Sequence, residues 1–152
     1  MKKGLWTLMY FLLFAFVFFG MWEWIQSWFF KDVTSDINKI IYFRLHCTAG
    51  DMIILSFFVG LWGGIKRGFH WFYNPGRNDY VAVSSMAMLY TAVSEYVNVY
   101  HLNTWGYSDL MPLLPGIGIG IVPLVQWAIL PAVVIKITKD HIRCITGSAL
   151  NS

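Results

Sequence analysis

Residues 5–30 read LWTLMYFLLFAFVFFGMWEWIQSWFF, and this stretch decides the fold class. A membrane-spanning helix needs about 20 predominantly apolar residues, and Glu23 is the one charged residue in the stretch. The sequence therefore predicts an all-α integral membrane protein, a four-helix bundle whose single polytopic domain occupies residues 1–152. The remaining three spans are expected at residues 45–65, 80–100 and 117–137.

The composition excludes a water-soluble domain. Hydrophobic residues make up 57% of the chain and charged residues 12%, whereas soluble domains usually carry about 25% charged residues. Aromatic residues make up 18%, which suits a membrane protein because Trp and Tyr favour the membrane–water interface. The net charge of +3 is spread over several loops and does not form the basic stripe of a nucleic-acid-binding protein.

The distribution of Lys and Arg predicts the topology, because basic residues are enriched in cytoplasmic loops. We expect a multi-pass protein of a bacterial inner membrane with both termini in the cytoplasm. The apolar run that follows the first two lysines resembles a signal peptide, but no small-x-small site follows, so an uncleaved first span is expected. Three basic residues fall on the outer side, namely Lys31, Lys39 and Arg44. Eight fall on the inner side, namely Lys2, Lys3, Lys66, Arg67, Arg77, Lys136, Lys139 and Arg143.

Three carboxylates lie inside the expected spans at a similar depth. Glu23, Asp51 and Glu95 are each about six residues inside the outer end of their span, which is about 9 Å at the helical rise. Ionisable residues within a membrane are costly and mark functional sites by default. We therefore expect Glu95 and Asp51 to supply acid–base or hydrogen-bonding groups in a site near the periplasmic face.

Each acid also has a purely structural interpretation. Glu95 and Asn98 could hold helices together by hydrogen bonds, and Arg44 could neutralise Asp51 on the same helix face. For Glu23 the favoured interpretation is a solvated acid in an aromatic belt, because it lies among Trp22, Trp24 and Trp28. The small side chains of the third span are expected to pack against another helix, and they are Ser84, Ala87, Thr91 and Ser94.

Other polar and aromatic residues at the outer level complete the expected binding site. Asn98 and Gln126 would orient a ligand, and Trp105 and Tyr107 would line the mouth. Gln126 also has a structural interpretation, as a partner for backbone carbonyls freed by the two prolines of the fourth span. The candidate binding residues are Asn98, Arg44, His46, His101, Trp105, Tyr107, Gln126 and Glu23.

These features leave three functions open. The leading hypothesis is a polar pocket near the periplasmic face that binds or modifies an amphiphile, such as a lipid, an isoprenoid or a quinone. The second is a non-catalytic subunit or assembly partner, whose partner is another membrane protein or a second copy of this chain. The third is periplasmic metal handling by His46, Cys47 and His101, whose spacing is not diagnostic. The pattern names no cofactor and does not decide whether the protein is an enzyme.

Overall fold

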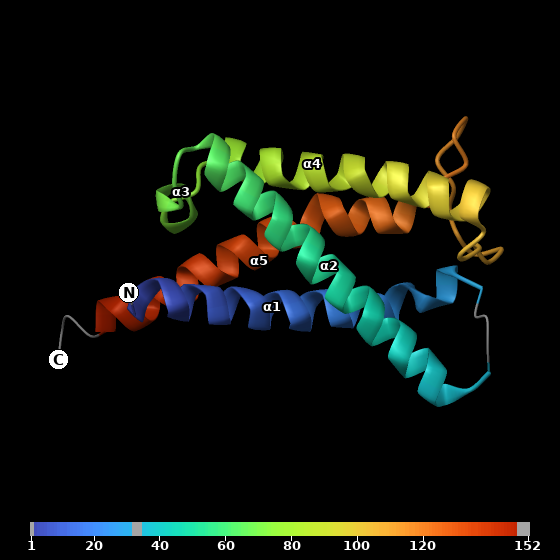
Figure 1. The fold of residues 1–152 in the computed structure, drawn as a ribbon, viewed down its shortest axis with the longest axis horizontal. Coiled ribbons are helices and arrows are strands. Elements are labelled where there is room, and N and C mark those ends of the chain that lie inside the picture. Colours follow the sequence, from blue (N-terminus) through green and yellow to red (C-terminus); the bar gives the residue numbers. More distant parts are fainter. Residues whose placement is uncertain (1, 32–34, 149–152) are drawn as a thin grey trace.

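The computed structural model describes residues 2–31 and 35–148, and apart from two isolated bridges its regular structure there is helical. A long loop of residues 103–120, which we call the outer loop, precedes the last helix, α5 (Ile121–Ser148). The helix α3 (His70–Tyr73) is a single turn (Figure 1). The elements in chain order are α1 (Lys2–Gln26), a 3₁₀ turn (Ser27–Phe29), α2 (Ile37–Ile65), α3 (His70–Tyr73), α4 (Arg77–Tyr96), a π-helix (Val97–Leu102) and α5 (Ile121–Ser148).

Three helical segments of the described chain are long and apolar enough to cross a membrane. They are Gly4–Phe29, Ile37–Ile65 and Ile121–Thr146. The expectation of a helical chain is therefore confirmed for the described residues, and three of the four expected spans are helices that could cross a membrane. The 20 residues of α4 do not reach the same mean hydropathy, because polar side chains are mixed with the apolar ones.

Several helix boundaries differ from the expected spans; for example, α4 begins at Arg77 and α5 extends to Ser148. Local chemistry explains two of the differences, the starts of α2 and α5. Helix α2 begins at Ile37 and not at residue 45, because the Asp36 side chain caps it by accepting a 2.9 Å hydrogen bond from the Asn38 backbone N–H. Helix α5 begins at Ile121 and not at residue 117. The glycines before it adopt the left-handed region, with φ of 84° at Gly116 and 80° at Gly118, which belongs to a turn.

The helices are not all aligned with one another. Helix α2 crosses α1 diagonally, and its first turns extend beyond α1, away from α4 and α5 (Figure 1). Helix α5 contacts both α4 and α1 along its length. The first turn of α1, all of α3 and the last turns of α5 lie at one end of the molecule, which we call the inner end (Figure 1). The outer loop lies at the opposite, outer end.

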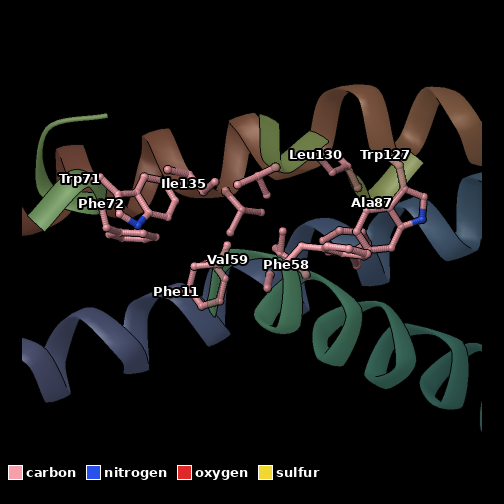
Figure 2. Packing of buried hydrophobic residues seen from close by; sticks show 14 residues of the cluster. Phe11, Phe58, Val59, Trp71, Phe72, Ala87, Trp127, Leu130 and Ile135 are labelled. Atoms are coloured by element: carbon pink, nitrogen blue, oxygen red, sulfur yellow. The ribbon is translucent and has the colours of Figure 1, made fainter. Parts of the chain in front are cut away.

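Apolar side chains from all five α-helices form the core. Phe19 of α1 packs on Trp127 of α5, with ring centroids 5.1 Å apart. Figure 2 shows Phe11 of α1 beside Val59 of α2. The expected small-residue face of α4 is largely buried and α4 packs chiefly on α5, so small side chains allow close helix approach there. Its buried members are Ser84, Ala87 and Thr91.

Candidate functional site

Glu23 is buried on α1 and is bound by its own helix. The residue is 4% exposed. Gln26 Nε2 donates a 2.5 Å hydrogen bond to Glu23 Oε1, and Trp22 Nε1 donates to Gln26 Oε1 at 3.0 Å. The interpretation of Glu23 as a solvated acid is therefore wrong. Its neighbours Trp24 and Trp28 are exposed, but Glu23 lies on the opposite face, which α2 covers.

Glu23 meets Asp51 where α2 crosses α1. The two carboxyl side chains are neighbours across the two helices. The helices approach closely at this level, because a Cβ at Gly20 would lie only 3.8 Å from the Thr48 methyl group. The positive charge of Arg44 also lies near Glu23. The crossing of α1 and α2 therefore brings two acids and a cation together.

Asp51 also connects α2 to α5. Gln126 Nε2 donates a 2.6 Å hydrogen bond to Asp51 Oδ2, and Gln126 is 2% exposed. This amide N–H is directed at the carboxylate and not at a carbonyl freed by Pro131, which lies inside α5. Asp51 is thus the point at which α1, α2 and α5 are joined by polar contacts.

Glu95 of α4 takes its partner from the outer loop. Tyr107 Oη donates a 2.5 Å hydrogen bond to Glu95 Oε2 and accepts one of 2.9 Å from the Gly120 backbone N–H. Burial and the hydrogen bond to Glu95 raise the pKa of Tyr107 above its ordinary value. Tyr107 therefore remains a donor at neutral pH. The Trp105 indole N–H lies close to Glu95 without reaching hydrogen-bonding geometry.

The backbone of the outer loop holds Tyr107 in place. Phe30 and Tyr107 form an isolated antiparallel bridge, and their rings pack with centroids 5.7 Å apart. The Lys31 N–H donates to the Gly106 carbonyl at 2.9 Å, and the Ser108 N–H donates to the Phe29 carbonyl at 3.0 Å. The end of α1 therefore fixes the loop residue that binds Glu95.

The three acids come from three helices, and each has a hydrogen-bonding partner, which is Gln26 for Glu23, Gln126 for Asp51 and Tyr107 for Glu95. Sequence reasoning missed Gln26, although its spacing of three residues from Glu23 within a span was a usable signal. We call the three acids and their hydrogen-bonding partners the acid cluster, which consists of Glu23, Gln26, Asp51, Glu95, Tyr107 and Gln126.

Five candidate residues are not members of the acid cluster. Arg44 and Trp105 lie beside it, and the other three make their contacts elsewhere. The Asn98 amide turns back on its own helix and donates to the Ser94 carbonyl at 2.9 Å. His46 is exposed and stacks on Tyr42, with ring centroids 6.1 Å apart. His101 is exposed on the π-helix and contacts the Tyr96 ring edge-on. None of these contacts reaches the acids.

The proposed metal ligands do not form a metal site. Among residues 2–31 and 35–148, no three His, Cys, Asp or Glu side chains are grouped so as to hold a metal ion. Cys47 and Cys144 are both exposed, free thiols on different helices. The geometry of the described chain therefore gives no support to metal handling.

A second polar group, at the inner end, joins α2 to α4. Asp79 accepts hydrogen bonds from Trp62 Nε1 at 2.9 Å and from the Gly76 N–H at 2.8 Å, and Lys66 Nζ lies 3.1 Å away. Burial opposes ionisation of Asp79, but these hydrogen bonds and the Lys66 charge together lower its pKa. The sequence offers one local signal for this contact, the capping position of Asp79 three residues after Gly76.

Comparison of the chain with protein-family models, with curated proteins and with solved structures finds no match. The functional argument therefore depends on the chemistry of the acid cluster. That cluster offers carboxyl groups that can exchange a proton, two amides that can bind oxygen or hydrogen-bond donors, and a phenol that donates.

Proposed function

We propose that the protein crosses a bacterial inner membrane four times, through α1, α2, α4 and α5, with both termini in the cytoplasm. Most basic residues then belong to the cytoplasmic side, as the positive-inside tendency requires. The polar side chains of α4 fit a span that is shielded by its neighbours, because α4 packs on α5 and α2. In this orientation the acid cluster lies towards the periplasmic face.

We further propose that the acid cluster binds the polar head of an amphiphile, such as a lipid, an isoprenoid or a quinone. The observation that carries the proposal is that three different helices each bring a carboxyl group into the bundle, where Glu23 and Glu95 are buried and Asp51 is partly buried. Keeping three carboxyl groups inside a membrane is costly. Uncharged polar side chains could hold the helices together at a lower cost than carboxyl groups. A role in binding a ligand therefore explains the three acids better than a purely structural role.

The residues of the cluster have separate roles in this proposal. Asp51 and Glu95 exchange hydrogen bonds or a proton with the head group, and Glu23 shares the proton of Asp51. Gln126 orients Asp51 from α5. Tyr107 holds Glu95 and, together with Trp105, forms the outer wall. Ligand binding then replaces some of the hydrogen bonds that the cluster makes with itself.

The test is the set of small molecules that co-purify with the full-length protein, extracted in mild detergent and analysed by mass spectrometry. We expect an isoprenoid, quinone or lipid at constant stoichiometry with the wild type, and its loss from Asp51→Asn and Glu95→Gln. Asp140→Asn is the matched control, because Asp140 is a half-exposed carboxylate paired with Lys136 and Lys139. The same molecule at wild-type stoichiometry in folded Asp51→Asn and Glu95→Gln would overturn the proposal.

A second candidate function is that of a subunit in a larger membrane complex. The observation that favours it is the way the first turns of α2 extend beyond α1 (Figure 1). These turns expose large side chains, including Ile37, Ile41 and Tyr42. Cross-linking from Tyr42 in native membranes, followed by identification of the attached peptide, tests this function. A cross-link to one defined protein would support it, and cross-links to lipid alone would exclude it.

A further inference from the structure

A cavity of about 390 Å³ lies between α1, α2 and α3 at the inner end of the molecule. Its floor consists of the buried side chains of Phe11, Val59 and Phe72, and its rim includes Leu8 and Phe69, which are 52% and 56% exposed. Figure 2 shows the floor residues facing one another across the three helices. The volume falls within the range of about 300–1,000 Å³ that small-molecule pockets occupy.

The cavity is distinct from the acid cluster. On α1 it reaches from Gly4 to Phe11, and Glu23 lies 12 residues further along, which is about 18 Å at the helical rise. No residue of the acid cluster is among those that line the cavity. A ligand in the cavity would therefore bind independently of the proposed periplasmic site.

The lining suits a hydrocarbon chain. Of its polar side chains, Thr7 and Tyr73 bring their hydroxyl oxygens within 3.3 Å of each other, and the Ser56 hydroxyl donates to the Met52 carbonyl of its own helix at 2.7 Å. The remaining lining is apolar. Apolar side chains that line an empty space lose dispersion contacts. In a membrane, a hydrocarbon chain of a lipid that enters the space would restore these contacts.

The size of the cavity argues against a protein segment. An α-helix is about 10 Å across and rises about 5.4 Å per turn. The volume of about 390 Å³ corresponds to roughly one such turn. It accommodates a single flexible chain more readily than a helix. A lipid tail that enters between the exposed rim residues, Leu8 and Phe69, meets the buried floor behind them.

Basic residues stand beside the cavity. Arg143 of α5 donates from Nη2 to the Tyr73 carbonyl at 3.4 Å and to Asn74 Oδ1 at 3.1 Å, so its charge lies at the end of α3. Arg67 lies two residues before the rim residue Phe69, in a left-handed turn with φ of 56°. Basic pockets beside membrane helices on the cytoplasmic side bind anionic lipid head groups.

We propose that this cavity binds one acyl chain of an anionic phospholipid, whose phosphate lies at Arg143 and Arg67. The chain fills the space between Phe11, Val59 and Phe72. The head group pairs with guanidinium groups, which match phosphate geometry. The protein is thus a specific lipid-binding protein at its inner end, whatever the acid cluster binds.

The test is native mass spectrometry of the full chain after removal of loosely bound lipid. Delipidated protein is mixed with phosphatidylglycerol or with phosphatidylcholine that carries the same acyl chains. We expect one retained phosphatidylglycerol per chain and about a tenfold preference over phosphatidylcholine. Equal retention of the two lipids by the wild type would overturn the proposal, and this comparison needs no variant.

Two variants fill the cavity from α2. A Cβ added at Gly60 meets no atom within 4 Å, so Gly60→Leu is expected to fold and to lower retention of phosphatidylglycerol about tenfold. Ser56→Leu fills the same space one helical turn earlier. If Gly60→Leu does not fold, retention of phosphatidylglycerol by Ser56→Leu tests the proposal instead. Gly50→Leu is the matched control, since a Cβ there also meets nothing within 4 Å and Gly50 is outside the cavity. Wild-type retention in a folded cavity-filling variant would overturn the proposal.

A third variant separates the head group from the chain. Arg143→Gln removes one cation without altering any side chain that lines the cavity, although the hydrogen bonds to Tyr73 and Asn74 are lost with it. We expect it to retain a lipid but to lose most of the preference for phosphatidylglycerol over phosphatidylcholine. An unchanged preference would exclude Arg143 as a phosphate ligand and overturn that part of the proposal.

Discussion

Gln126 and Asp51, which are 75 residues apart in the chain, are joined by a hydrogen bond of 2.6 Å between α5 and α2. The bond joins α5 to α2 near the level where α2 crosses α1. Its donor is buried, since Gln126 is 2% exposed, and its acceptor Asp51 is partly buried. The fold and the proposed binding site therefore depend on the same pair.

Gln126→Leu is expected to destabilise the protein by about 1 kcal/mol, the size typical of a hydrogen bond between membrane helices. The physical reason is that Asp51 loses a donor that it cannot replace with water. Thr138→Val is the control, because the buried Thr138 hydroxyl bonds its own helix at the Val134 carbonyl and joins no two helices. Reversible unfolding in mixed micelles measures both variants. Equal effects from the two would show that Gln126 contributes no special link.

Tyr107→Phe is expected to loosen the outer loop. The substitution removes the donor to Glu95 and the acceptor of the Gly120 N–H. Hydrogen exchange at the Gly120 amide should accelerate about tenfold, the equivalent of one net hydrogen bond of about 1.4 kcal/mol.

Tyr100→Phe is the control for this measurement. Its hydroxyl donates to the Gly118 carbonyl in the same loop at 2.8 Å, but it makes no bond to Glu95 or to the Gly120 amide. We expect exchange at Gly120 to remain as in the wild type. If Tyr100→Phe accelerates hydrogen exchange at Gly120 as much as Tyr107→Phe does, the loop opens as a whole. The hydrogen bonds of Tyr107 would then have no special part in holding the loop.

Stability at low pH should depend on Asp79. Its folded pKa is lowered by hydrogen bonds from Trp62 and Gly76 and by Lys66, against the opposing effect of burial. A lowered folded pKa adds stability that is fully present above the unfolded value, near pH 3.9, and is lost as the pH falls through the folded value.

The prediction for Asp79 concerns a difference between two proteins, because other carboxyl groups also titrate. The stability of the wild type minus that of Asp79→Asn should be constant from about pH 7 to about pH 5 and should shrink below about pH 4. Unfolding measured at each pH gives this difference. A difference that grows as the pH falls would contradict the assigned direction.

The proposed topology predicts which side each end of the molecule faces. Cys144 of α5 is exposed and should react with a membrane-impermeant maleimide only in inverted vesicles. Asp109→Cys, placed in the exposed outer loop of a protein in which both native cysteines are alanine, should react only in intact spheroplasts. Labelling of both positions from the same side would contradict the proposed orientation.

The helical class and the apolar helices α1, α2 and α5 could be predicted from the sequence, because apolar length indicates them. A span was also expected at residues 80–100, but the polar side chains of α4 keep it below the hydropathy of the other three. The start of α2 depended on the Asp36 cap, which lies in the polar segment between the apolar windows. The start of α5 depended on the left-handed turn at Gly116 and Gly118.

The acids of the site were predictable, but their partners were not. Counting residues along the spans placed Glu23, Asp51 and Glu95 at a similar depth and drew attention to Gln126, but it could not show which side chains meet. The burial of Glu23 depends on the diagonal path of α2, which no local pattern encodes. Asn98 bonds its own helix because the chain departs from α-helical geometry immediately after Tyr96, a change that helical spacing does not anticipate.

The diagonal path of α2 also makes the protein sensitive to bilayer thickness. Its 29 residues measure roughly 43 Å along the helix axis, whereas the hydrocarbon core of a bilayer is about 30 Å thick. A helix of this length relieves the mismatch by tilting. A thicker membrane would bring α2 more upright and would change the angle at which it crosses α1. Bilayer thickness would then alter the packing around Gly20 and Thr48, where the two helices meet.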